Sequence, residues 1–145
     1  GAFSFSAQPY YLLAIYKYNT LENNDIMFDG LGGGYDAAIS IHTSGVQFYA
    51  GAGPIYSGSE DWDLDPHAGQ WYLNGAGSSM KIDGVTVTGD VGTLASSTGL
   101  RLASRFNGQQ DADIDYLEAM LLPSTISTDD LSTVFVYLRE KAGTD

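Results

Sequence analysis

Short apolar segments separated by glycine-containing turns follow one another as far as Pro123, and this rhythm restricts the fold more than any other feature. The first segment, QPYYLLAIYKY (residues 8–18), is apolar and aromatic at both odd and even positions. Successive side chains of a strand point to opposite sides of its sheet, so this pattern predicts a strand buried on two faces or flanked by a second sheet. Further strands are predicted in DIMFDG, AAISIHTSGVQFYAG, QWYLNG, SSMKIDGVTVTG, GLRLASRF and DADIDYLEAMLL. Three dipeptides predict tight turns between or after strands: Asp29-Gly30, Ser44-Gly45 and Asp83-Gly84.

The periodicity changes after Pro123. Ser127 and Asp130 predict a capping box at the start of a helix, and Gly143 predicts its end. The apolar positions between them recur at helical spacing: Leu131, Val134, Phe135 and Leu138. One amphipathic helix is therefore expected to close the chain against a sheet.

No linker, repeat or low-complexity tract divides the 145 residues, so residues 1–145 are predicted to form one domain. Many short strands with one closing helix predict an all-β antiparallel β-sandwich of the jelly-roll type. The chain has no cysteine, which excludes disulfides and thiolate metal sites. It starts at Gly1, and we expect it to be a processed piece of a longer protein.

The net charge is strongly negative, at -12. Such a field repels nucleic acid and anionic membrane surfaces, so neither is expected as a partner. No apolar stretch approaches the roughly 20 residues of a membrane-spanning helix, and membrane insertion is not expected.

The order of motifs resembles the laminin-G-like, concanavalin-A-like jelly-roll domains of bacterial surface proteins and phage virion proteins. The resemblance rests on a "FDG" turn, a hairpin ending in "YAG", an acidic loop before a tryptophan, then "KIDGVTVTGDVG", "GLRLASR" and a last strand entering the helix. Glu118 stands where these domains carry a strand glutamate. The N-terminal strand of the family is short or missing here, and the stretch after Trp71 is compressed.

The resemblance implies a fold but leaves several functions open, because these domains include lectins, adhesins, carbohydrate-binding modules, viral structural domains and a few glycoside hydrolases. A hydrolase would use Asp113, Asp115 and Glu118. In a regular strand the two aspartates face one side and Glu118 faces the other, so the three converge only if a bulge intervenes. No catalytic residue is therefore predicted, and the chain is not expected to be an enzyme. Neither His42 nor His67 has the sequence context of a nucleophilic triad.

The acidic loop GSEDWDLDPHAGQW contains carboxylates at alternate positions, Asp61, Asp63 and Asp65, which are predicted metal ligands. Hard oxygen ligands of this kind suit calcium. The loop is not a helix-loop-helix calcium site, because Pro66 stands where that site needs glycine and Tyr72 where it needs glutamate. Calcium is accordingly the one cofactor considered, and solvated loop aspartates are the alternative.

Sugar recognition needs an exposed aromatic ring that stacks on a pyranose, together with amides and carboxylates that bind its hydroxyl groups. Trp62 is the preferred platform, and its alternative role is to plug the end of the sandwich. The full set of predicted ligand-binding residues is Trp62, Tyr35, Tyr56, Asn107, Gln109 and Asp111.

These features predict a non-catalytic recognition or adhesion module, lectin-like and carbohydrate-binding, within a larger extracellular or virion protein. Its expected partner is a glycan or a host or virion surface protein. The alternative is a structural domain of a phage capsid or tail fibre, in which an uncovered sheet edge would favour homo-oligomers. A glycoside hydrolase is the third hypothesis.

Overall fold

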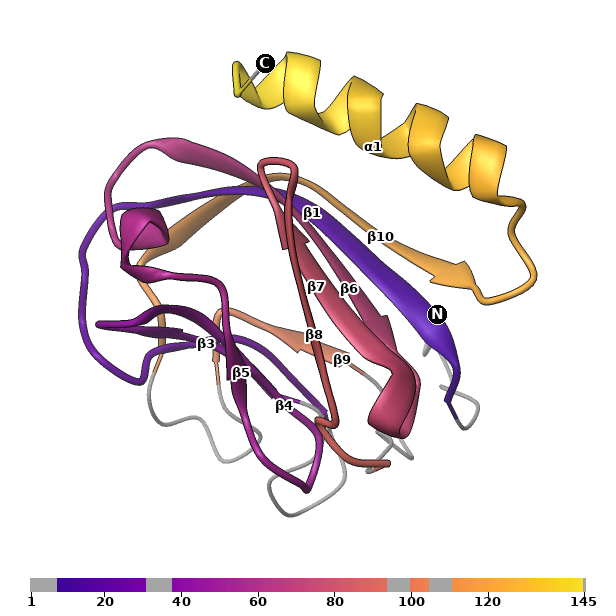
Figure 1. Cartoon of the computed structure of the whole chain (residues 1–145). Helices are drawn as coiled ribbons and strands as arrows, with labels where there is room; N and C mark the ends of the chain where they lie inside the picture. Colours follow the sequence, from indigo (N-terminus) through magenta and orange to yellow (C-terminus); the bar gives the residue numbers. More distant parts are fainter. Residues whose placement is uncertain (1–7, 31–37, 94–99, 105–110, 145) are drawn as a thin grey trace.

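The structure is a computed structural model that describes residues 8–30, 38–93, 100–104 and 111–144. In these residues two five-stranded antiparallel sheets pack face to face, and a C-terminal helix lies on the outer side of one of them (Figure 1). This confirms the predicted β-sandwich with a closing helix. The described part of the chain contains no helix that is long and apolar enough to span a membrane.

The sheet under the helix, sheet A, has the strand order β10-β1-β6-β7-β8. Its strands are β1 (Tyr10–Tyr18), β6 (Pro66–Leu73), β7 (Ser78–Ile82), β8 (Val85–Gly89) and β10 (Ile114–Pro123). The opposite sheet, sheet B, has the order β5-β4-β3-β2-β9. Its strands are β2 (Ile26–Gly30), β3 (Ala38–His42), β4 (Gly45–Tyr49), β5 (Ile55–Tyr56) and β9 (Leu100–Leu102). Two single-turn 3-10 helices, η1 (Ser59–Asp61) and η2 (Gly75–Gly77), flank β6.

Strand β1 is buried on both faces, as its sequence predicts. Leu12, Ala14 and Tyr16 enter the core between the two sheets. Leu13 and Ile15 point the other way, into a second core beneath the helix. The apolar run thus separates two hydrophobic layers, and its neighbours β10 and β6 pair with it along nearly its whole length.

Helix α1 (Thr128–Ala142) begins and ends where the sequence predicts. The backbone N–H of Asp130 donates to the Ser127 hydroxyl at 3.1 Å, and Gly143 adopts a left-handed conformation with φ 78°. Phe135 and Leu138 are fully buried against sheet A, whereas Val136 is 48% exposed. The amphipathic pattern therefore orients the helix on the sheet.

Two details of the sequence interpretation are wrong, and β10 contains a bulge whose position the sequence did not give. Asp29 and Gly30 form no turn but continue β2, where Asp29 pairs with Arg101 of β9. The hairpin between β3 and β4 turns one residue earlier than predicted, since His42 pairs directly with Gly45. A bulge at Leu117, where Tyr16 pairs with Tyr116 and Ile15 with Glu118, switches the face of β10. Because of it, Tyr116 packs in the inter-sheet core while Met120 and Leu122 pack under the helix.

Replacing Leu138 by alanine should lower the free energy of unfolding by about 2–5 kcal/mol, because it removes a fully buried side chain from the helix–sheet core. Val136→Ala on the exposed face is the control and should change it by less than about 0.5 kcal/mol. Urea denaturation measures both, and equal losses would contradict the packing of the helix.

Candidate functional site

The outer face of sheet B carries a hollow of about 500 Å³. The described residues that line it are Asn24, Ile26, Ala38, Ser40, Gln47, Tyr49 and Pro54. Residues at alternate positions of β3 and β4, such as Ile39 and Phe48, face the core, and this alternation turns Ser40, Gln47 and Tyr49 outward. The alternation of the strands therefore lines the hollow with an amide, a hydroxyl and a phenol group, beside the apolar side chains of the same lining.

A row of hydrogen bonds crosses three strands beside this hollow. The Ser40 hydroxyl donates to the Gln47 carbonyl at 2.8 Å, and the Gln47 amide donates to the Tyr56 hydroxyl at 2.9 Å. The bonds hold the Gln47 side chain in one orientation without satisfying all of its donors and acceptors. The Tyr56 ring in turn packs against His42, with centroids 5.0 Å apart. Ser40 is buried at 3% exposure, so it orients Gln47, and the half-buried Gln47 and Tyr56 are the members of the row that reach the surface.

The predicted sugar-binding residues fall in different places. Tyr56 belongs to the row beside the hollow, and Asp111 is exposed and bridges to Ile26 in its lining. Trp62 is half-buried and packs against the inter-sheet core, which is its alternative role of plugging the sandwich. Tyr35, Asn107 and Gln109 lie outside the described residues.

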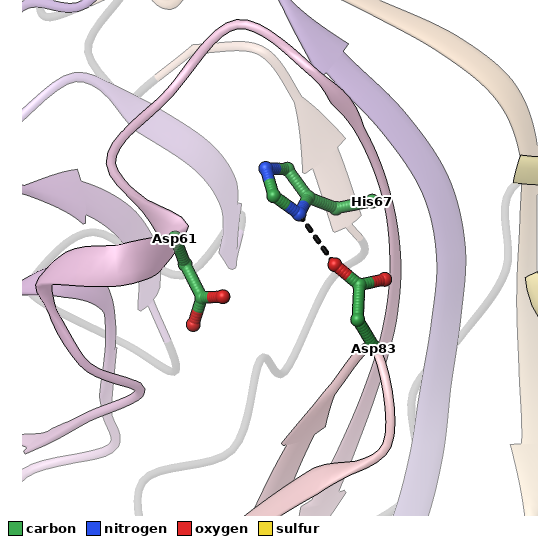
Figure 2. Close-up of side chains that lie close together, drawn as sticks. All are labelled: Asp61, His67 and Asp83. Carbon is green, nitrogen blue, oxygen red and sulfur yellow. Dashed lines mark hydrogen bonds and ion pairs between the residues drawn. The ribbon is translucent and has the colours of Figure 1, made fainter. Parts of the chain in front are cut away.

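A second group of polar side chains gathers at the start of β6. Figure 2 shows Asp61, His67 and Asp83 turned toward one another, with their potential ligand atoms within 4.8 Å. His67 Nδ1 lies 2.6 Å from Asp83 Oδ2, and Nε2 lies 3.1 Å from Asp63 Oδ1. His67 itself is buried at 4% exposure, whereas the side chains of Asp63 and Asp83, which contact its two ring nitrogens, are 41% and 23% exposed.

Local structure explains how distant residues converge on this site. Asp83 has φ 47° at the tight turn between β7 and β8, and its Oδ1 accepts the Ala68 N–H at 2.7 Å. Asp61 ends η1, and Asp63 follows in the loop to β6. The pocket around them measures about 420 Å³ and is also lined by the end of α1 at Ala142, Gly143 and Thr144.

The charges of this group are coupled. Burial opposes the imidazolium of His67, but the hydrogen bond to Asp83 and the charges of Asp83, Asp63 and Asp61 raise the pKa of His67 overall. Burial raises the pKa of Asp61, against the opposing effects of a hydrogen bond from Ser57 and the charge of His67. Both pKa shifts favour the protonated form of the residue, which lowers the net negative charge of the group.

The loop aspartates predicted as metal ligands separate in the structure. Asp61 and Asp63 face His67, whereas Asp65 is exposed and donates its N–H to Asp63 Oδ1 at 2.7 Å. In their arrangement with His67 and Asp83 these groups could hold a cation. The sequence interpretation did not include His67 and Asp83 among the metal ligands. Two signals pointed to them: Asp83 occupies a predicted turn, and His67 follows Asp63 by four residues.

The bulge that the hydrolase hypothesis requires is present in β10. It turns Asp115 and Glu118 to the same face of sheet A, because their partners Lys17 and Ile15 are two residues apart on β1. The bulge at Leu117 places Glu118 on the helix side of sheet A, where Lys141 Nζ lies 2.9 Å from it and the Tyr137 hydroxyl 3.3 Å from it. Asp115 is exposed and pairs in register with Lys17. Glu118 therefore anchors the end of the helix.

No family model and no curated protein matches the chain. Solved structures do match its fold. Trypanosoma rangeli sialidase in complex with sialic acid aligns over 94% of this chain and 24% of its own, with 18% identity and a TM-score of 0.66. Domain 4 of AbnA, an extracellular arabinanase from Geobacillus stearothermophilus in complex with arabinotriose, aligns over 90% of this chain and 68% of its own, with 14% identity and a TM-score of 0.61. The chain thus spans about a quarter of the sialidase, and these likenesses define a β-sandwich fold. The laminin-G-like resemblance stays a prediction.

Asp83→Asn keeps a residue that tolerates the left-handed conformation of the turn but removes the charge beside His67. Groups from β1 (Tyr16 and Tyr18), η1 (Asp61) and the following loop (Asp63) still surround the ring. Because the folded state raises the pKa of His67, the stability that this pair contributes is present below about pH 6.5 and is lost as pH rises through the folded pKa.

The variant should therefore lose about 1–3 kcal/mol at pH 6 and less at pH 9, measured by denaturation in metal-free buffer. NMR titration should show a lower pKa for His67 in the variant. A loss of the same size at both pH values would contradict the charge pairing, and Asp65→Asn is the control that should leave the pKa of His67 unchanged.

Proposed function

We propose that the chain is a non-catalytic carbohydrate-binding module whose site is the hollow on the outer face of sheet B. The observation that carries this proposal is the preorganised row of Ser40, Gln47 and Tyr56 beside that hollow. Sugar hydroxyls need donors and acceptors that are already oriented, because each polar group that orders on binding reduces the affinity. Tyr49 adds a half-buried ring for an apolar sugar face.

The fold neighbours support this direction. Both are domains or parts of proteins that act on carbohydrates, and both were solved with a sugar bound. Arabinotriose and sialic acid are therefore the first ligands to test. The strongly negative charge of this chain favours a neutral oligosaccharide over anionic sialic acid. We place the module in an extracellular setting, as part of a larger protein that presents it to a glycan.

Gln47→Ala should weaken the binding of a neutral oligosaccharide by about 5–30-fold, since it removes a fixed hydrogen-bonding group worth about 1–2 kcal/mol. Tyr49→Ala should weaken it by a similar factor through the loss of stacking. A glycan array identifies the ligand, and isothermal titration calorimetry measures the variants. Thr88→Ala, exposed on β8 of the other sheet, is the matched control and should bind like the wild type.

The proposed location of the sugar-binding site can be wrong even if the chain binds sugars, and the two are tested separately. Binding that survives Gln47→Ala and Tyr49→Ala but is lost in Trp62→Ala would move the site to the acidic loop. No binding to any glycan, together with a stable trimer in light scattering, would instead favour the structural-domain hypothesis.

The absence of catalysis has its own test. Incubation with arabinan or a sialylated oligosaccharide should release no product above the background rate, because Glu118 is engaged by Lys141 and Tyr137. Chromatography of the reaction mixture measures this. Product formation that disappears in both Asp115→Asn and Glu118→Gln would overturn the non-catalytic assignment.

A further inference from the structure

We propose that Asp61, His67 and Asp83 bind a divalent transition-metal ion of the Zn²⁺ class, with Asp63 as the positioning residue for the imidazole. The site is independent of the proposed sugar-binding hollow, which lies on sheet B. Its role would be structural: the ion would join η1, the start of β6 and the turn between β7 and β8. η1 and the start of β6 are neighbours in the sequence, and the turn at Asp83 meets them at this pocket.

The geometry supplies a compact set of donor atoms. One oxygen of Asp61, one of Asp83 and a ring nitrogen of His67 lie within 4.8 Å of one another (Figure 2). Ligand atoms around a tetrahedral zinc ion are about 3.3 Å apart, given metal–ligand distances of about 2.0–2.2 Å. A rotation of the Asp61 side chain, with a small widening of the contact between His67 and Asp83, would close the set around an ion.

Two of the three donors, Asp83 and His67, are already oriented by a neighbour. Asp83 Oδ1 accepts the Ala68 N–H, which leaves Oδ2 directed at His67 Nδ1. On the far side of the ring, Asp63 Oδ1 lies 3.1 Å from Nε2 and can accept its proton. A carboxylate that holds the outer N–H of a ligating histidine fixes the tautomer and makes the inner nitrogen available to a metal. In the metal-bound state Nδ1 would bind the ion and Nε2–H would donate to Asp63.

The surroundings are short of positive charge. The described residues that line the pocket include Glu60, Asp61, Asp63, Asp65 and Asp83, and His67 is their only basic group. The C-terminal end of α1, at Ala142 to Thr144, adds the negative end of a helix dipole. The imidazole of His67 and the guanidinium of Arg139, which donates to the Thr144 carbonyl, balance only part of this charge, and a divalent ion would balance more of it.

A buried hydroxyl near His67 is a separate sign of an incomplete site. Tyr16 is fully buried, and its ring lies 5.5 Å from that of His67. Its hydroxyl forms no hydrogen bond of normal geometry with the residues that the structure describes. Burial first, then the charges of Tyr18, Asp61 and Asp83 and a poorly aligned contact with the Tyr18 hydroxyl, raise the pKa of Tyr16, so its phenol stays a neutral donor. A water molecule on a bound ion would give it a partner.

The donor chemistry selects the ion. Calcium prefers six to eight oxygen ligands, and the buried imidazole of His67 offers a nitrogen instead. Imidazole with carboxylates suits zinc and neighbouring first-row ions. The cation that the acidic loop was predicted to bind is thus reassigned from calcium to this class, and Asp65 is replaced in the donor set by His67 and Asp83.

The experiment is a titration of the tag-free, chelator-treated domain with ZnCl2 by isothermal titration calorimetry. We expect saturable binding of one ion per chain and a higher melting temperature with the ion. Asp61→Asn and His67→Gln should abolish this binding, while Asp63→Asn should weaken it about 10–100-fold. The control that should bind like the wild type is His42→Gln, which replaces the other histidine, outside the lining of the pocket.

NMR of the wild type locates the ion even if a variant fails to fold. Zinc should shift the ring nitrogen resonances of His67 and leave those of His42 in place. No saturable zinc binding would overturn the proposal. Equal shifts of both histidines, unchanged affinity in a folded His67→Gln, or binding of calcium but not zinc would overturn it as well. None of these outcomes bears on sugar binding at Gln47, which calorimetry measures separately.

Discussion

The burial of β1 on both faces is the constraint on which the rest of the structure depends. Its even-numbered side chains fill the space between the two sheets, and Leu13 and Ile15 fill the space beneath the helix. A strand that is apolar on both sides needs cover on both sides, so neither sheet B nor α1 can be removed without exposing part of it. The three layers are a consequence of this one segment.

The two candidate sites occupy surfaces that this arrangement leaves open. Sheet B has its inner face on the core and its outer face uncovered by the helix, and the hollow lies on that outer face. Sheet A is covered by α1, and the acidic pocket lies where the helix ends. A polar row on an open sheet face is suited to an extended ligand, whereas a recessed cluster of charges at a junction of segments is suited to an ion. The sites therefore serve different chemistry.

The bulge in β10 shows how one inserted residue changes an interpretation. In a regular strand, Tyr116, Glu118 and Met120 would share a face, and the sequence suggests this. With Leu117 as the extra residue, Tyr116 reaches the inter-sheet core and donates to the Met27 carbonyl, while Glu118 reaches the helix and pairs with Lys141. The same bulge turns Asp115 and Glu118 to one face of sheet A, where Asp115 is exposed and Glu118 pairs with the helix. Periodicity alone could not locate the bulge, because its position depends on pairing with β1.

The sequence by itself determined the class of fold, the double burial of β1, the hairpin at Asp83 and Gly84, and both ends of the helix. These depend on local preferences: strand period, turn residues that accept a positive φ, and capping groups within one helical turn. Only the tertiary structure decided that Trp62 packs on the core and that Ser40, Gln47 and Tyr56 align across three strands. The same holds for the meeting of Asp61, His67 and Asp83. Their proximity depends on strand order and on the exact register of the strands, which a hairpin or turn signal in the sequence does not specify.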